Sequence, residues 1–359
     1  MQDFQTFVEA AKAHPGNMAG RDGVAPGRRP SRREFLRACL GIGLLAGSGA
    51  ISGCAFSEAP GLSIATNPWI GYELLYLGRD LAASEAQAGG SRVRLVELIS
   101  NTDSMQALAA GTVDGAGLTL DEVISAHAAG LDLKIVLVFD YSAGADVLLA
   151  RPGIDRLGAL KGRRIGVEQS GVGALMLDAA LKQAGLAAQD IRLVNLTADQ
   201  HLSAFGRDEV DAVVTFEPIA GQIAAAGGRR LFDSRAIPGS IVDVLAIRAA
   251  TLAANPDAAR MLVAQYFNAL AYLRRHPGDA HRRMAPRLGL SAEAMRDGYQ
   301  FLELPDLAEN RRLLRGSPSP LAASAAGLAA LMLEKELIAR PVDVADFVVD
   351  TCLPEAQQA

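Results

Sequence analysis

Residues 62–84 read LSIATNPWIGYELLYLGRDLAAS, and this stretch contains the structural unit that later parts of the chain repeat. The apolar run at 62–67 ends at Asn67-Pro68, which predicts a strand followed by a turn. From Tyr72 to Ser84 the apolar residues recur at 74, 75, 77 and 81, the spacing of one face of a helix. The stretch therefore predicts a strand–turn–helix unit.

Similar strand–helix units form two clusters, at about 62–139 and 164–232, joined by extended segments at 139–150 and 232–248. Repeated units of this kind predict an α/β fold with mainly parallel sheets. Two strand crossings between two sheets predict two lobes with a paired hinge. We expect lobe 1 at 62–140 plus 243–359, lobe 2 at 145–232, and hinges at about 139–146 and 232–243.

The region 1–53 has the pattern of an export signal. Arg32 and Arg33 stand in the sequence SRREFLR, which is typical of a twin-arginine signal. The apolar stretch Ala38–Ile51 is too short and too rich in glycine to span a bilayer. The sequence ISGC that ends at Cys54 resembles a lipobox, so we expect lipid on Cys54, a linker at 54–61, and a protein tethered to the periplasmic or cell-surface face of the membrane.

Composition excludes several other roles. The formal net charge of −5 argues against nucleic acid as a partner. Of the three cysteines, Cys39 and Cys54 fall in the export region, so Cys352 has no partner for a disulfide in the folded body. We expect a body that depends on its apolar core and is monomeric.

Candidate ligand-binding residues lie in the loops that follow the predicted strands, because ligands of open α/β sheets bind beyond the carboxyl ends of the strands. Trp69, the only tryptophan, lies in such a loop and is either a core residue or a wall of a binding cleft. Polar residues after other strands are either helix caps or ligand contacts. Glu217 either accepts a hydrogen bond from a ligand or complements the dipole of the helix that begins at Pro218.

Catalytic patterns are absent from the sequence. The five histidines have no partners at zinc-ligand spacing, and there is neither a nucleophile elbow nor a phosphate-binding loop. We therefore expect no enzyme activity, no metal and no cofactor.

Five motifs carry a family resemblance: TNPWIGYE (66–73), LTLDE (118–122), DYSAGAD (140–146), KGRRIGVE (161–168) and VTFEP (214–218). In these motifs the chain resembles the solute-binding proteins of nitrate/sulfonate/taurine-type ABC importers, a superfamily that also includes thiamine-pyrimidine-binding proteins. The resemblance implies a two-lobed periplasmic binding protein fold of type II topology. It also implies capture of a small nitrogen- or sulfur-containing solute by hinge closure and delivery to an ABC permease with a cytoplasmic ATPase.

Together, the loop positions and the resemblance predict these ligand-binding residues: Asn67, Trp69, Tyr72, Asn101, Thr102, Thr119, Asp140, Ser142, Ser170, Gly171, Glu217 and Asp243. Arginine and lysine are missing from these loops except at their margins, so a strongly charged dianion is not expected. A monoanion, or a neutral heteroaromatic solute stacked on Trp69, fits equally well. The alternative function is a bilobed sensor for a membrane signalling partner.

Overall fold

The structure is a computed structural model, and it describes residues 61–84, 93–168 and 171–355. The predicted export residues Arg32 and Arg33, the predicted lipid site Cys54 and the loop residue Ser170 lie outside these ranges. Within them, no helix combines the length and the apolar character needed to cross a membrane.

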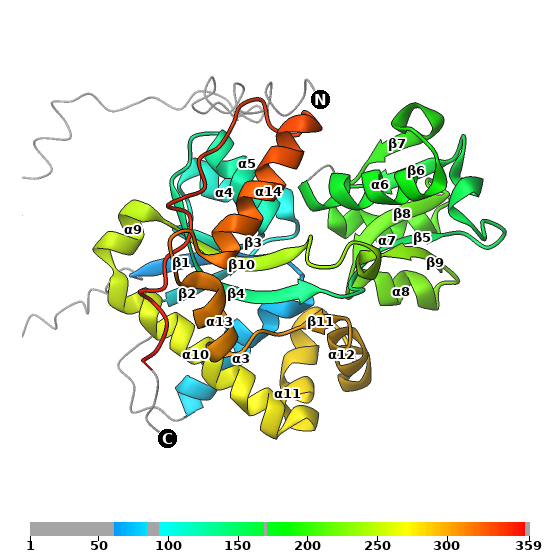
Figure 1. Ribbon diagram of the computed structural model, residues 1–359. Coiled ribbons are helices and arrows are strands. Elements are labelled where there is room, and N and C mark those ends of the chain that lie inside the picture. Colours follow the sequence, from blue (N-terminus) through cyan, green and yellow to red (C-terminus); the bar gives the residue numbers. More distant parts are fainter. Residues whose placement is uncertain (1–60, 85–92, 169–170, 356–359) are drawn as a thin grey trace, which may run out of the picture. The chain divides into compact units, whose positions relative to one another are not determined.

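Two sheets organise the described chain (Figure 1). The six-stranded sheet has the order β11-β4-β10-β3-β1-β2, with strands β1 Leu62–Thr66, β2 Val93–Glu97, β3 Gly115–Thr119, β4 Leu133–Ser142, β10 Val242–Arg248 and β11 Leu302–Glu303. The five-stranded sheet has the order β7-β6-β8-β5-β9, with strands β5 Asp146–Ala150, β6 Arg164–Val167, β7 Arg192–Asn195, β8 Ala212–Phe216 and β9 Arg229–Asp233.

The helices alternate with the strands through the first two thirds of the chain and then follow one another. Those between strands are α3 Glu73–Ser84, α4 Asn101–Ala110, α5 Leu120–Ala128, α6 Gly171–Ala184, α7 Ala198–Gly206 and α8 Ile219–Ala225. The C-terminal helices are α9 Ala249–Ala254, α10 Pro256–Arg275, α11 Pro277–Met284, α12 Ala292–Tyr299, α13 Leu307–Leu314 and α14 Pro320–Glu334. The predicted α/β alternation is confirmed.

The strand directions correct one prediction, because the sheets are mixed rather than mainly parallel. Strands β1, β2 and β3 run parallel, as do β6, β7 and β8. In contrast, β10 is antiparallel to both β3 and β4, and β5 is antiparallel to both β8 and β9. The antiparallel strands are those at the two passages between the sheets, from β4 to β5 and from β9 to β10. A returning strand enters its sheet from the opposite end and therefore runs against its neighbours.

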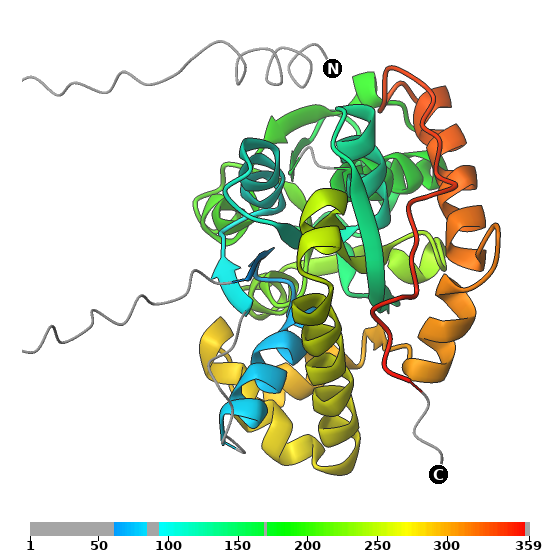
Figure 2. The same ribbon diagram turned by 90° about the vertical axis from the view of Figure 1, so that its left-hand side faces the viewer.

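The C-terminal helices pack on the elements of the six-stranded sheet. Helix α10 lies along α3, α13 contacts β4, and α14 contacts α5 (Figure 2). After α14 the chain returns to the sheet, where Val348 forms an isolated parallel bridge with Ile135 of β4.

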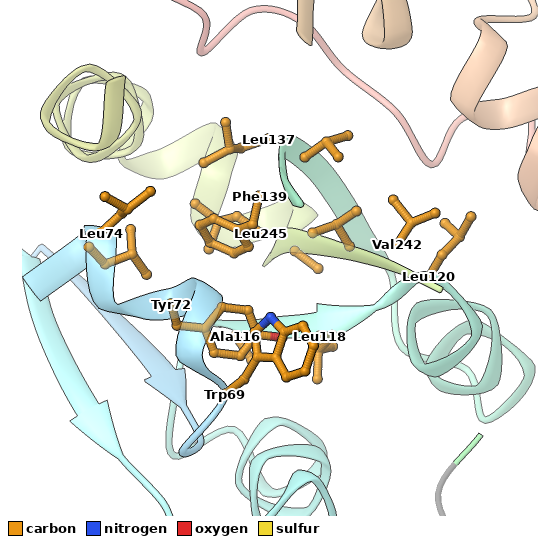
Figure 3. Close-up of a cluster of buried hydrophobic side chains, with 14 of the residues drawn as sticks. Trp69, Tyr72, Leu74, Ala116, Leu118, Leu120, Leu137, Phe139, Val242 and Leu245 are labelled. Atoms are coloured by element: carbon orange, nitrogen blue, oxygen red, sulfur yellow. The ribbon is translucent and has the colours of Figure 1, made fainter. Parts of the chain in front are cut away.

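The core beneath these helices includes the loop that follows β1. Trp69 and Tyr72 lie in one apolar cluster with Leu118 of β3, Phe139 of β4 and Leu245 of β10 (Figure 3). Burial of such apolar area stabilises a fold by about 25 cal/mol per Å². The loop after β1 is thus held by the same core that fixes the central strands.

Candidate ligand-binding site

The structure places most of the predicted site residues in the interior. Thr102 is half-buried and Gly171 is partly exposed, while Ser170 lies outside the described residues. The others are buried: Asn67, Trp69, Tyr72, Asn101, Thr119, Asp140, Ser142, Glu217 and Asp243.

A chain of hydrogen bonds connects the loops that follow β1, β2 and β3. The Trp69 backbone N–H donates to Asn67 Oδ1 at 2.8 Å, and the Asn67 amide donates in turn to Asn101 Oδ1. Asn101 Nδ2 donates to Glu122 Oε1 at 2.8 Å, while Glu122 Oε2 accepts from the Thr119 backbone N–H at 3.0 Å. Because each amide has both a donor and an acceptor in use, the three loops are held in one arrangement.

Next to this network, two aspartates lie directly opposite each other on neighbouring strands. Asp243 of β10 pairs in register with Asp140 of β4 on one side and with Thr119 of β3 on the other. The Tyr72 hydroxyl donates to Asp243 Oδ1 at 2.6 Å, and Trp69 Nε1 donates to Asp140 Oδ2 at 3.2 Å. The six-stranded sheet therefore presents a carboxylate pair flanked by two aromatic donors.

The first passage between the sheets is fixed by two serines. Ser142 Oγ lies 2.8 Å from Ser234 Oγ, so the passage from β4 to β5 is bonded to the passage from β9 to β10. The backbone N–H groups of Gly144 and Asp146 donate to Ser234 Oγ at 2.6 Å and to Ser142 Oγ at 3.0 Å. Asp146, at the start of β5, is thereby placed beside the crossing point.

Glu217 follows β8 on the five-stranded sheet. Its Oε2 accepts from the Gly221 backbone N–H at 2.9 Å, and Arg230 donates to its Oε1 at 3.3 Å. The Arg230 guanidinium also donates to the Gly144 carbonyl and lies 4.7 Å from the ring centre of Phe301. The contact with Gly221 agrees with the predicted role at the start of α8, and the ligand role of Glu217 stays a prediction.

Direct contacts join elements of the two sheets. Glu168 Oε1, after β6, accepts from the Thr102 backbone N–H at 2.9 Å and from its hydroxyl at 2.6 Å. The ring of Trp69 meets that of Phe216 edge to face, with centroids 5.7 Å apart. A β-carbon at Gly171 would overlap Asp121 Oδ2, so only glycine permits this approach of α6 to α5. Trp69 is therefore a residue of the core of the six-stranded sheet, and its ring also contacts Phe216 of the five-stranded sheet.

Electrostatically, this interior is acidic. Burial raises the pKa of Asp140 to about 8, although the hydrogen bond from Trp69 acts in the opposite direction and lowers it. Burial also raises the pKa of Asp146, to about 7. The pKa of Asp243 is also raised, first by burial and then by the charge of Asp140. Burial and the neighbouring Asp121 raise the pKa of Glu122. Each carboxyl is pushed toward its neutral form because the charged form loses water and faces like charges.

Four of the buried acids described above were not among the predicted site residues: Asp121, Glu122, Asp146 and Glu168. Two patterns carried a partial signal, since Asp146 ends the motif DYSAGAD and Glu168 ends KGRRIGVE. The position of Glu122 in a helix cap concealed its second bond to Asn101, because that partner is distant in sequence.

Within the described residues, no group of three histidines, cysteines or acids is arranged to hold a metal ion. His201 is buried on α7, with Nδ1 lying 3.0 Å from Thr215 Oγ1, and burial lowers its pKa to about 4. A histidine with such a pKa is neutral at physiological pH. The chemistry of the interior is therefore that of hydrogen-bond acceptors, amides and aromatic rings.

Comparison with known proteins identifies related sequences. A protein-family model described as NMT1/THI5 like matches residues 87–280. A proposed binding protein of Brucella abortus (strain 2308) is 25% identical over 226 residues, covering 58% of this chain and 68% of the relative. A proposed aliphatic sulfonates-binding protein of Escherichia coli (strain K12) is 32% identical over 169 residues, 45% of this chain and 53% of the relative.

Solved structures show the same fold. The ligand-binding component of an ABC-type import system from Staphylococcus aureus, with zinc bound, superposes with a TM-score of 0.69 at 18% identity, covering 83% of this chain and 99% of its own. The periplasmic aliphatic sulphonate-binding protein of Escherichia coli gives 0.64 at 23% identity, with coverage of 80% and 96%. The desulfurization enzyme DSZB gives 0.59 at 18% identity, with coverage of 81% and 97%. The predicted periplasmic binding protein fold is confirmed.

Proposed function

The chain belongs to the NMT1/THI5-like family, and on this premise we propose that it is the solute-binding component of an ABC importer. The carrying observation is that two predicted site residues beside the six-stranded sheet contact residues of the five-stranded sheet, Trp69 with Phe216 and Thr102 with Glu168. A solute bound there contacts both halves of the fold at once. The solute we propose is small and contains nitrogen or sulfur.

Capture occurs by rotation of one sheet and its helices against the other. The two passages between the sheets are the proposed hinge, and the Ser142–Ser234 contact holds them together while they bend. Hinge closure of this kind is common where two domains enclose a ligand. A solute favours the closed state only through contacts that the open state lacks. In the proposed closed state, the bonds from Thr102 to Glu168 would join the two halves alongside the solute.

The proposed role is binding without turnover. Enzymes also use this fold, as the similarity to DSZB illustrates. The described region contains one free thiol, Cys352, which is buried, and burial raises its pKa. A neutral buried thiol is a poor nucleophile. The arrangement favours a binding protein over a catalyst.

Outside the membrane, lipid on Cys54 would hold the protein near the permease and its ATPase. The twin-arginine pattern at Arg32 and Arg33 and the lipobox carry this part of the proposal. Replacing Cys54 with serine should move the protein from the membrane fraction to the soluble fraction. Continued membrane association of Cys54→Ser would contradict lipid anchoring.

Binding and closure can be measured together. Spin labels on exposed positions of α7 and α10 report the distance between the two halves, while calorimetry reports binding of sulfonates, nitrate, pyrimidines and amines. We expect one solute class to bind and to shorten the distance. Binding with no change in distance would contradict hinge closure, and turnover of a bound solute would contradict a purely binding role.

A further inference from the structure

We propose that the solute is an organic cation, a protonated amine or an amidinium, held by Asp140, Asp146 and Asp243. This inference rests on the proposed binding function and narrows its ligand class. The three carboxylates come from both sheets, since Asp140 lies on β4, Asp243 on β10 and Asp146 on β5. A cation bound among them would contact both halves of the fold.

Each of the three carboxylates has unused acceptor capacity. Their residues are at most 5% exposed, yet Asp140 Oδ1, Asp146 Oδ2 and Asp243 Oδ2 accept no hydrogen bond in the described structure. Buried polar atoms are nearly always hydrogen-bonded, and an unpaired one is costly. Three such oxygens close to one crossing point indicate a ligand that brings donors.

Basic side chains do not satisfy these oxygens. Among the ion pairs of the described residues, none involves Asp140, Asp146 or Asp243. Arg230, the guanidinium near the crossing, is bonded to Glu217 and lies 3.8 Å from Asp233. Ammonium and amidinium groups carry only donors, so they complement these acids in their ionised form, and a bound cation favours that form. A sulfonate or nitrate offers only acceptors and would add like charge to the ionised acids.

Aromatic residues lie next to the same carboxylates. Trp69 and Tyr72 bond to Asp140 and Asp243, and Phe216 is the cross-strand partner of Asp146 on β8. The negative faces of aromatic rings attract cations, and this attraction grows when the cation is desolvated. Carboxylates interleaved with rings from both sheets form a suitable environment for an organic cation.

Charge also links binding to closure. Asp243 experiences the charges of both Asp140 and Asp146, and Asp146 in turn experiences those of Asp121 and Glu217. Bringing these acids together without a counter-charge is unfavourable, whereas a cation between them offsets the repulsion. The ligand's charge would then supply differential affinity for the closed state.

The test is calorimetric titration of the purified full chain with butylamine, putrescine, benzamidine, ethanesulfonate, nitrate, cytosine and zinc chloride. We expect an amine or amidine to bind most tightly. Asp140→Asn and Asp243→Asn should each weaken its binding by roughly 10- to 150-fold, the effect of losing a charged hydrogen-bond partner. Asp257→Asn, whose side chain is 89% exposed in a surface pair with Arg260, is the matched control and should bind as the parent does.

The outcomes separate the ligand class from the general role. Tightest binding of ethanesulfonate, nitrate, cytosine or zinc would overturn the cation proposal and leave solute capture intact. Failure of every solute to bind would count against both proposals. Equal cation affinity in the parent, Asp140→Asn and Asp243→Asn would also overturn the proposal, provided that circular dichroism shows the variants folded.

Discussion

Replacing Asp140 with asparagine is expected to stabilise the folded chain at pH 8 and to have a smaller effect at pH 5. Burial raises the pKa of this carboxyl from 3.8 to about 8. One pKa unit corresponds to about 1.4 kcal/mol, so the full shift represents about 6 kcal/mol. Because Asp140 interacts with the charges of Asp243 and Asp146 and shares this energy with them, we expect a gain of about 2–4 kcal/mol for the single variant.

The direction follows from where the proton is bound. Below about pH 4, Asp140 carries its proton in the folded and the unfolded chain alike. As the pH rises above 4, the unfolded chain releases the proton and the folded chain keeps it until about pH 8. The free energy of unfolding therefore falls across this window. Asparagine remains neutral and can still accept the hydrogen bond from Trp69 Nε1, so it avoids the loss.

Urea denaturation at pH 5, 6.5 and 8, followed by circular dichroism, measures the effect. Fluorescence of Trp69, the only tryptophan, reports the same transition beside the substituted residue. Asp257→Asn, at an exposed position, should show no pH-dependent gain. An Asp140→Asn variant that is no more stable than the parent at pH 8, or that gains equally at pH 5, would refute the reasoning.

Two further substitutions test other contacts. Arg287→Met should lower the free energy of unfolding by roughly 3–5 kcal/mol, because it leaves the fully buried Glu73 carboxylate without its guanidinium partner. Urea denaturation measures this loss. A loss below about 1 kcal/mol would show that the pair contributes little. Gly171→Ala should weaken solute binding at least about tenfold, because its β-carbon overlaps Asp121 and opposes closure. Gly206→Ala, whose β-carbon meets nothing within 4 Å, is the control, and equal affinities of the two variants would exclude this steric role.

Local patterns in the sequence predict the elements well. The strand predicted at 62–67 appears as β1 Leu62–Thr66, and the helix predicted from Tyr72 to Ser84 appears as α3 Glu73–Ser84. These predictions succeed because apolar spacing and turn residues act within a few positions of the chain. Strand direction was less accessible, since β5 and β10 acquire their antiparallel neighbours from distant segments.

For the candidate site, too, the sequence indicated the positions of residues but not the contacts between them. The sequence indicated Asn67, Trp69 and Asp140 because they follow strands, but it did not indicate their bonds to one another. The sequence also suggested a monoanion or a neutral heteroaromatic ring as the ligand, because few basic residues occur in the loops. It did not reveal which acidic residues are buried together, because burial depends on the tertiary structure.

By itself, the sequence determined the order of strands and helices, the family, and the loops in which polar residues gather. Only the tertiary structure decided that Asp140 and Asp243 lie opposite each other and that Asp140, Asp146 and Asp243 are buried, each with one oxygen unpaired. The physical reason is that apolar periodicity is a local property, whereas burial and charge depend on which distant segments meet. A carboxyl that looks like an ordinary loop or strand residue in the sequence acquires a raised pKa when folding removes its water and places a second carboxyl opposite it, and a cation would offset that cost.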